Sequence, residues 1–264
     1  EDCPKEQRKD WIKTIPGPRG FIGNESAYIK KLREEAETLA SSRHGVACFI
    51  ADSVFSSDGI YEIPKGFLKK IYQEIRSFGG VVIADEVQSG FGRLGDQMWA
   101  YQDDAVVPDI VTMGKPMGNG HPVSALLTHR ELIESLDQAY NGNSYFNTFG
   151  GNPVSAAAAL SVLDIIEEDS LIDQAGQVGD YLKKQLRNTL QNKESVVEIR
   201  GKGLFLGIEL DDPSKTAKTM EEMMRQGVLV GKTGPTNSVI KLRPSMTFKK
   251  EHADLLVEKL NQCL

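Results

Sequence analysis

The order of apolar and polar residues along the chain predicts helices that alternate with buried strands. Apolar side chains recur at helical spacing from residue 26 to 42, and an unbroken apolar run follows at 46–51. Residues 64–78 form a second amphipathic stretch, with proline in its first turn, and lead into the apolar run at 81–84. Because such runs are typical of parallel strands covered on both faces, the pattern indicates an α/β sheet.

The pattern continues through two more apolar runs, at 110–113 and 123–128. Asn152 and Pro153 form a cap and first helical turn, and the alanine-rich stretch from there to residue 168 predicts a long buried helix. A second helix is expected at 171–190. These elements predict a large α/β unit.

The periodicity changes near residue 192. Strand-like alternation is found at 196–200, 204–210, 228–230 and 239–242, and helical spacing near 214–226 and from residue 249 onward. We therefore predict a large domain at 1–191 and a small C-terminal α+β domain at 192–264.

Composition narrows the class of protein. The chain has 264 residues, of which 26% are charged and 40% hydrophobic, as in ordinary globular proteins. Its formal net charge of −6 argues against nucleic acid as a partner. No apolar run is long enough to cross a membrane, and residues 1–6 are too polar for a signal peptide, which favours the cytoplasm or the mitochondrial matrix.

The three cysteines, Cys3, Cys48 and Cys263, are far apart and odd in number, so neither a disulfide scaffold nor a metal site is expected. Cys48 lies in an apolar run and is predicted to be a buried thiol. The first residue is not methionine, and prolines and glycines interrupt residues 15–20. We expect the chain to begin part-way through a longer protein.

The candidate chemistry lies at two predicted strand ends. Asp85 directly follows the run at 81–84, and Lys115 follows the run at 110–113 after one glycine. Ligands of open α/β sheets sit at the carboxyl ends of the strands. A lysine that forms a Schiff base and a carboxylate that keeps a pyridine nitrogen protonated are what pyridoxal phosphate requires. By spacing alone, a helix cap and a solvated lysine remain alternatives.

Two other features near Lys115 have plainer interpretations. The glycines at 114–120 do not form a nucleotide-binding P-loop, because Lys115 comes before most of them and is followed by proline. His121 is close enough in sequence for a proton-shuttle role, but its place between Gly120 and Pro122 favours a histidine that fixes a turn.

Three longer segments resemble the class III aminotransferases: DEVQSGFGR at 85–93, PDIVTMGKPMGNGHP at 108–122 and NTFGGNP at 147–153. The last two are most similar to the alanine–glyoxylate aminotransferase 2-like subgroup, which includes phospho-lyases acting on phosphoethanolamine and phosphohydroxylysine. The resemblance covers nearly the whole chain from about Pro16. It implies pyridoxal 5'-phosphate as cofactor and the fold type I architecture, with a mainly parallel sheet in a partial large domain.

The resemblance also implies roles for five residues. Lys115 matches the Schiff-base lysine, Asp85 the partner of the pyridinium nitrogen, and Val87 the side chain against the ring face. Gln88 matches the residue near the ring hydroxyl, and Thr148 the hydroxyl given to the cofactor phosphate of a neighbouring subunit. A homodimer with shared active sites is the assembly implied.

The residues themselves leave alternatives at two of these positions. Thr148 precedes Gly150, Gly151 and a predicted helix start, which suits a phosphate, but a plain turn with a helix cap would look the same. Gln88 is equally compatible with a polar residue that is satisfied within a turn.

The chain departs from the family in two places. The family's glycine/serine phosphate loop and ring-stacking aromatic, which lie upstream in other members, have no counterpart here. In the segment 239–244, Lys241 stands where many members place an arginine for the substrate carboxylate, and Arg243 follows two residues later.

Three functions follow as hypotheses. The first is a transaminase that moves an amino group from an amine or amino acid to an oxo acid through a Schiff base on Lys115. The second is a phospho-lyase that eliminates phosphate from a phosphorylated amine such as phosphoethanolamine, which the cations Lys241 and Arg243 would suit. The third is a non-catalytic remnant of the same fold, favoured by the missing loop.

Overall fold

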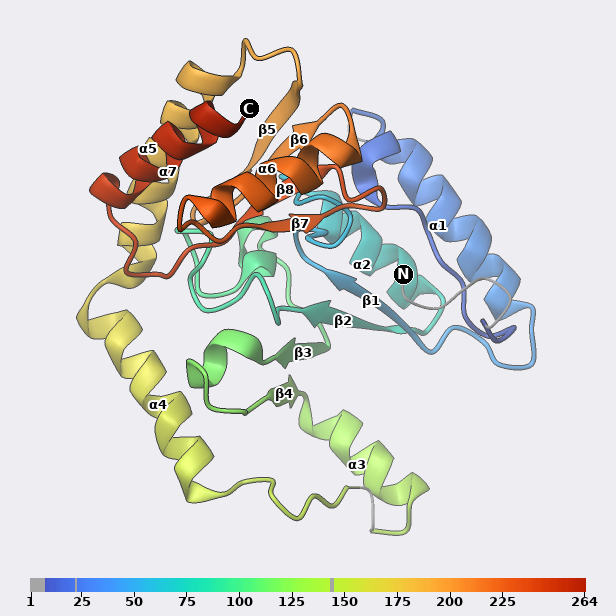
Figure 1. Ribbon diagram of the computed structural model, residues 1–264. Coiled ribbons are helices and arrows are strands. Elements are labelled where there is room, and N and C mark those ends of the chain that lie inside the picture. The colour runs from blue at the N-terminus through green and yellow to red at the C-terminus, as the bar shows by residue number, and fades with distance from the viewer. Residues whose placement is uncertain (1–7, 22, 143–144) are drawn as a thin grey trace.

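A computed structural model describes residues 8–21, 23–142 and 145–264, and Cys3 lies outside these ranges. Its first sheet, sheet A, has the order β1-β2-β3-β4, with β1 at Cys48–Asp52, β2 at Val81–Asp85, β3 at Ile110–Met113 and β4 at Ala125–Thr128. The first three strands are parallel, and β4 is antiparallel to β3. The mainly parallel α/β sheet expected from the sequence is therefore present (Figure 1).

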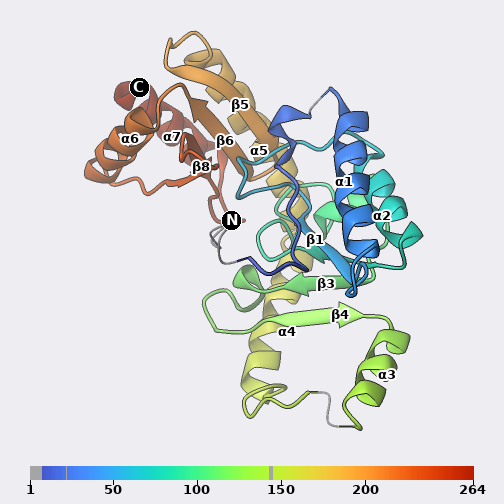
Figure 2. The same ribbon diagram turned by 90° about the vertical axis from the view of Figure 1, so that its right-hand side faces the viewer.

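Helices α1, at Glu25–Ala40, and α2, at Phe67–Ser77, cover one face of sheet A (Figure 2). The capping side chain of Asn24 accepts a hydrogen bond from the backbone of Ala27 and fixes the start of α1. The core between the helices and the sheet is built from the side chains Tyr28, Leu32, Phe67, Leu68, Ile71, Tyr72, Ile75 and Val82.

The opposite face of sheet A is open. Ile50 is 58% exposed and Leu126 is 57% exposed, and strand alternation places both on the face that α1 and α2 do not cover. The prediction that β1 is covered on both faces is therefore wrong, and so is the prediction that Cys48 is a buried thiol, because Cys48 is exposed on this face.

Helix α3, at Arg130–Ala139, was not predicted, and the next helix is α4, at Pro153–Glu168. In Figure 1, α3 and α4 extend away from the body of the molecule. Helix α4 is not the buried helix expected from its alanine content: Leu160 is 59% exposed and Val154 66%, while only Ala159 and Ile166 are buried along it. Its bounds agree with the prediction.

Sheet B has the order β5-β6-β8-β7, with β5 at Val196–Lys202, β6 at Phe205–Leu210, β7 at Gly231–Thr233 and β8 at Val239–Leu242. All of its pairings are antiparallel. Its core is shared with α5 at Leu171–Leu190, α6 at Pro213–Arg225 and α7 at Lys250–Cys263. The strand predicted at 228–230 is three residues too early. The domain boundary near residue 192 stays a prediction.

Helix α5 touches the backbone of both halves of the molecule at a glycine junction. A Cβ atom added to Gly95 would lie 2.3 Å from the Cα of Gly176, and one added to Gly179 would lie 2.3 Å from the carbonyl carbon of Gly203. Since Gly176 and Gly179 are one helical turn apart on α5, this face of the helix has no room for side chains. The loop before η3 and the turn between β5 and β6 therefore meet α5 directly.

Three short 3-10 helices complete the described structure: η2 at Pro18–Gly20, η3 at Ala100–Asp104 and η4 at Lys115–Gly118. Within the described ranges, no helix has the length and hydrophobicity that a membrane crossing requires. Nor do three or more His, Cys, Asp or Glu side chains of those residues gather in a way that could hold a metal ion.

Candidate active site

Lys115 begins η4, two residues after the end of β3. Its φ of +30° lies in the left-handed region, which residues with a Cβ rarely adopt. Backbone strain of this kind costs on the order of 1–3 kcal/mol and is often found at functional sites. The turn is held by a hydrogen bond from the Met117 amide to the carbonyl oxygen of Gly114, 2.8 Å long.

Asp85 ends β2, beside β3, so the structure places it and Lys115 at neighbouring strand ends as the sequence predicted. The Oδ1 atom of Asp85 accepts a hydrogen bond from the backbone of Val87 at 3.0 Å and a long one from the hydroxyl of Thr112 at 3.5 Å. These contacts orient the carboxylate on the open face of sheet A.

Val87 lies against the backbone of Gly114. Its Cγ1 atom is 3.9 Å from the position that a Cβ on Gly114 would take, so Val87 packs beside the residue that precedes Lys115. Gln88 follows and makes two hydrogen bonds: its Nε2 donates to Ser56 Oγ at 2.9 Å, and its Oε1 accepts from Arg243 Nη1 at 2.8 Å. Gln88 is therefore a satisfied polar residue, and its second partner comes from beyond β8.

Lys241 and Arg243 approach the same site from sheet B. Burial lowers the pKa of Lys241, and the positive charges of Arg243 and Lys115 lower it further, while the negative charge of Asp52 opposes them. The hydrogen bond from Arg243 to Gln88 joins this end of sheet B to the loop that follows Asp85. The structure thus brings Lys115, Asp85, Val87, Gln88, Lys241 and Arg243 into one region.

Glu86 was given no role from the sequence, yet it is the most buried acid near the site, with an exposed fraction of 0%. Its Oε1 atom accepts hydrogen bonds from Ser53 Oγ and the Tyr101 amide, and its Oε2 atom from Ser89 Oγ and the Ala100 amide, at 2.7–3.1 Å. Burial raises the pKa of Glu86, and these hydrogen bonds lower it in part. The sequence does contain one indication of this residue, because Glu86 is the second of two acids that follow the apolar run at 81–84.

Asp52 is a second acid that the sequence did not single out. It pairs in register with Asp85 across β1 and β2. Its carboxylate accepts hydrogen bonds from the amides of Val54, at 2.9 Å, and Ser56, at 3.0 Å, and from the hydroxyl of Ser56. Burial raises the pKa of Asp52 in spite of these bonds.

Thr148 lies in the exposed loop before α4. Among the described residues, no hydrogen bond joins Thr148 to Lys115, Asp85 or Gln88, so the structure does not bring it into the group around Lys115. Its proposed partner, the site of a neighbouring subunit, stays a prediction. The start of α4 itself is capped by Asn152, whose Oδ1 accepts from the Ser155 amide at 2.9 Å.

The ring of His121 is engaged away from the lysine. Its Nε2 atom lies 2.8 Å from Ser155 Oγ, and its amide donates to the carbonyl of Gly118 at 2.9 Å. These contacts tie the end of η4 to the first turn of α4, which agrees with a histidine that fixes a turn.

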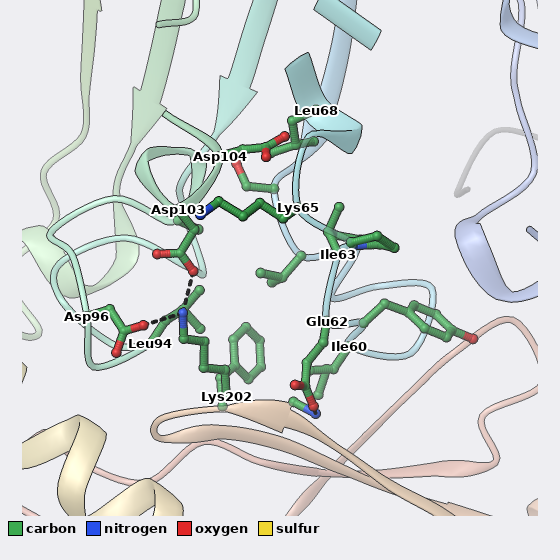
Figure 3. Close-up of a pocket in the computed structure, with 17 residues that line it drawn as sticks. Ile60, Glu62, Ile63, Lys65, Leu68, Leu94, Asp96, Asp103, Asp104 and Lys202 are labelled. Atoms are coloured by element: carbon green, nitrogen blue, oxygen red, sulfur yellow. Dashed lines mark hydrogen bonds and ion pairs between the residues drawn. The ribbon is translucent and has the colours of Figure 1, made fainter. Parts of the chain in front are cut away.

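A separate cavity of about 350 Å³ opens between η3, the start of α2 and the β5–β6 turn (Figure 3). None of the predicted site residues lines it. Lys202 lies between Asp96 and Asp103, with its Nζ atom 2.5 Å from an oxygen of each (Figure 3). Since this lysine is paired within the chain, we do not assign the cavity to the active site.

Comparison with known proteins shows which family the chain resembles. The family described as aminotransferase class-III matches residues 12–264. An alanine–glyoxylate aminotransferase 2-like protein of Drosophila melanogaster is 39% identical over 279 residues, covering 98% of this chain and 56% of that protein. Ethanolamine-phosphate phospho-lyase homolog 1 of Caenorhabditis elegans is 35% identical over 283 residues, covering 97% and 60%.

A solved structure of an Arthrobacter phospholyase in complex with phosphoethanolamine superimposes with a TM-score of 0.86 at 40% identity, covering 96% of this chain and 61% of that one. A Bacillus anthracis aminotransferase superimposes with the same TM-score at 28% identity, covering 98% and 63%. The chain thus spans between about half and three fifths of the length of these relatives.

Proposed function

The chain belongs to the class III aminotransferases, which are pyridoxal-phosphate-dependent enzymes, and from this premise we propose that it carries the lysine half of a transaminase active site. The proposed reaction moves an amino group from an amine or amino acid to an oxo acid. The observation that carries the proposal is the pair of Lys115 and Asp85 at neighbouring strand ends, with Lys115 held in a strained turn.

The side chains around Lys115 fit pyridoxal phosphate. A primary amine, a carboxylate at the next strand end and a branched apolar side chain against Gly114 are the groups that its aldehyde, ring nitrogen and ring face require. When bound, the cofactor supplies an aldehyde that condenses with amines and a ring that accepts electrons from Cα. Lys115, Asp85 and Val87 would hold it, with Gln88 near the ring hydroxyl.

Each residue has a definite task in this proposal. The Nζ atom of Lys115 would hold the cofactor covalently and, when free, would be the base for the proton on the substrate Cα. The carboxylate of Asp85, oriented by Val87 and Thr112, would supply the negative charge that favours a proton on the ring nitrogen. Val87 would lie against the ring and exclude water from one side.

A phospho-lyase acting on a phosphorylated amine is the second candidate. A specific observation favours it: Lys241 and Arg243 approach Lys115, and neither is ion-paired with any residue in the described ranges. Two of the relatives are phospho-lyases by name, and one of these has been solved with phosphoethanolamine. A non-catalytic remnant of the fold is the third possibility and predicts no attachment of cofactor to Lys115.

We also propose a homodimer in which Thr148 of one subunit completes the phosphate site of the other. The exposed apolar side chains of α4 and the position of Thr148 outside the group around Lys115 support such an assembly. For location we propose the cytoplasm or the mitochondrial matrix, because some relatives are mitochondrial by name.

The test is to locate the cofactor chemically. The chain is incubated with pyridoxal phosphate, reduced with borohydride, digested and analysed by mass spectrometry. We expect the added mass on the peptide containing Lys115 and its loss in Lys115→Ala, whereas Lys232→Ala, a change at an exposed lysine, leaves it in place. Equal labelling of the wild type and Lys115→Ala would contradict the proposal.

A second measurement separates the candidates. Two activities are assayed in parallel on the catalytically active homodimer. One is phosphate release from phosphoethanolamine, and the other is amino transfer to an oxo acid. Amino transfer without phosphate release supports the transaminase, and the reverse supports the phospho-lyase.

A further inference from the structure

Ser56 joins three segments that are far apart in the chain. Its amide and its hydroxyl both donate to the Oδ2 atom of Asp52 at the end of β1, the amide at 3.0 Å. Its Oγ atom accepts from Gln88 Nε2 at 2.9 Å, and its carbonyl oxygen accepts from the hydroxyl of Thr233 on β7 at 2.7 Å. Because Ser56 is only 1% exposed, these partners take the place of water.

The backbone directly before Ser56 is strained. Phe55 has a φ of +48°, in the left-handed region that residues with a Cβ rarely adopt. Its amide donates to the carbonyl oxygen of Asp52 at 3.1 Å and closes the turn after β1. Strain of this kind is common where a side chain must be held in a defined place. In this turn, the hydroxyl of Ser56 is held between Asp52 and Gln88.

Asp52 determines which role the hydroxyl can play toward Gln88. The Oδ1 atom of Asp52 accepts from the Val54 amide at 2.9 Å and Oδ2 from the Ser56 amide, and these donors favour the ionised carboxylate. Since an ionised carboxylate has no hydrogen to give, the hydroxyl of Ser56 donates to it. The lone pairs of Ser56 Oγ are then left for a donor, which is the NH2 group of Gln88.

Both ends of the Gln88 carboxamide are thereby fixed. Its Nε2 atom faces Ser56, and its Oε1 atom accepts from Arg243 Nη1 at 2.8 Å. Arg243 is an exposed side chain, whereas Ser56 is buried, so water competes more with the bond to Arg243 than with the bond to Ser56. One hydrogen of Nε2 remains as the donor that Gln88 can offer to a ligand.

From this arrangement we infer that Ser56, held by Asp52, is a positioning residue of the cofactor site. It makes Gln88 present an N–H group, and not a carbonyl oxygen, to the bound ring. The inference rests on the proposed function, in which Gln88 lies near the ring hydroxyl. An N–H group stabilises negative charge on the ring oxygen, whereas a carbonyl oxygen opposes that charge. Ser56 acts through Gln88 and not on the cofactor itself.

The first test needs no cofactor. Hydrogen exchange of the side-chain NH2 group of Gln88 is measured by NMR on the isotopically labelled 264-residue chain. Ser56→Ala removes the acceptor, so this exchange should become at least about fivefold faster. Asp52→Asn should change it in the same direction, because an amide NH2 at this position can donate to Ser56 Oγ and compete with Gln88.

Two further variants separate the hydroxyl from general effects of substitution. Ser56→Thr keeps a hydroxyl at the same place and should retain slow exchange of the Gln88 NH2 group. Ser57→Ala is the matched control, because Ser57 is the neighbouring serine and is exposed.

The second test follows the absorbance of the chain loaded with pyridoxal phosphate as the pH is changed. In Ser56→Ala, less of the negative charge on the ring oxygen is neutralised, so the neighbouring proton is held more tightly. The pH midpoint of the absorbance change should therefore rise by at least about half a unit. Ser56→Thr should restore the midpoint, and Ser57→Ala should not move it. A loss of stability alone lowers the melting temperature and leaves this midpoint in place.

Two results would overturn the inference. Equal NH2 exchange in the wild type and Ser56→Ala would show that Ser56 does not hold Gln88. Faster exchange with an unchanged midpoint would show that the orientation of Gln88 does not affect the cofactor. Faster exchange in Ser56→Ala but not in Asp52→Asn would remove Asp52 from its part. Circular dichroism shows whether each variant is folded, and Ser56→Cys, whose sulfur is a weak acceptor, replaces Ser56→Ala if that variant is not.

Failure here is distinguishable from failure of the proposed function. The borohydride experiment tests the attachment of the cofactor to Lys115, and the NH2 exchange of Gln88 does not depend on it. A chain that labels at Lys115 but keeps the wild-type midpoint in Ser56→Ala retains the proposed function and loses this role of Ser56. A chain that does not label at Lys115 loses both the proposed function and the role of Ser56 in it.

Discussion

Neighbouring acids at the end of β2 have different environments because a strand directs successive side chains to opposite faces. Asp85 lies on the open face of sheet A, beside β3 and near Lys115. Glu86 points the other way and is fully buried among the loops that follow β1 and β2. Asp85 is therefore available to a ligand, whereas Glu86 holds the surrounding loops together by hydrogen bonds.

Replacing Glu86 with glutamine should destabilise the fold. Each carboxylate oxygen accepts one backbone N–H, from Ala100 or Tyr101, so either orientation of the amide places an NH2 group against a backbone donor. One buried N–H then has no acceptor, which costs about 1–3 kcal/mol. Urea unfolding at pH 7 measures the difference, with Glu134→Gln, a change at an exposed residue of α3, as the control.

The difference in unfolding free energy between the wild type and Glu86→Gln should also depend on pH, in a direction that the pKa of Glu86 determines. Burial raises the pKa of Glu86 above its ordinary 4.5, so the folded state binds this proton more tightly than the unfolded state does. The stability that this adds is fully present below pH 4.5 and is lost as the pH rises through the pKa of the folded protein. The advantage of the wild type over Glu86→Gln should therefore shrink with rising pH, and a growing advantage would contradict the raised pKa.

Asp85→Asn should leave the fold intact and weaken the site. The amide no longer places a negative charge beside the ring nitrogen, so we expect cofactor affinity to fall at least about tenfold and turnover by orders of magnitude. Cofactor titration followed by absorbance and a melting curve separate the two effects. Asp180→Asn, on the exposed side of α5, is the matched control. Unchanged affinity in Asp85→Asn would remove Asp85 from its role.

Single residues were predictable from the sequence where the chain order alone places them. Lys115 and Asp85 follow apolar runs directly, so their position at the sheet edge needed no tertiary information. The contact between Gln88 and Arg243 spans 155 residues and depends on how sheet B meets sheet A, which no local pattern contains. The burial of Glu86 depends likewise on the loops after β1 and β2 and on η3, which meet around it.

Among the elements, η4 and α4 form a linked pair. Asn152 caps α4, and Ser155 in its first turn contacts His121 just beyond η4. The segment that carries Lys115 is thus anchored on a helix that begins more than thirty residues later in the chain.

Asn152→Ala should loosen this link. Loss of the capping bond to the Ser155 amide and of the bond from Nδ2 to the Phe149 carbonyl should cost about 1 kcal/mol of stability. Hydrogen exchange should speed up at the first turn of α4. Asn152→Asp keeps the capping oxygen and serves as the control. Equal exchange rates in Asn152→Ala and Asn152→Asp would show that the cap does not hold this turn.

The elements themselves were largely predictable, and the errors have physical causes. Helix α4 has the predicted bounds because a capping asparagine and a proline mark its start, and α5 because its helical spacing is regular. Helix α3 was missed because it follows β4 without a capping side chain. The exposure of β1 and α4 could not be foreseen, since apolar composition reports what a segment would bury and not what lies against it.

The whole molecule presents apolar surface on the open face of sheet A and along α4, which bears on assembly. Scattered exposed apolar residues are ordinary, but a contiguous set marks an interaction surface. The proposed homodimer would use this surface and would bring Thr148 of each subunit to the other site.

Mixing two inactive variants tests the shared site. Both variants are made in the catalytically active homodimer. Lys115→Ala removes the residue to which the cofactor is proposed to attach, and Thr148→Glu places a negative charge where the cofactor phosphate is expected. If the sites are shared, a heterodimer collects both lesions in one site and leaves the other intact, so the mixture should regain up to about half of the wild-type activity per heterodimer. No recovery, with subunit exchange verified by mass spectrometry, would count against sharing.

The glycine junction on α5 limits which substitutions the protein can accept during evolution. Gly95, Gly176, Gly179 and Gly203 let three backbone segments touch where even a methyl group would collide. A survey of all single substitutions, scored by abundance of folded protein in cells, should therefore show an intolerant patch at these four positions. The intolerance would come from close backbone packing and not from a catalytic role of these residues. Neutral evolution must therefore leave this contact unchanged.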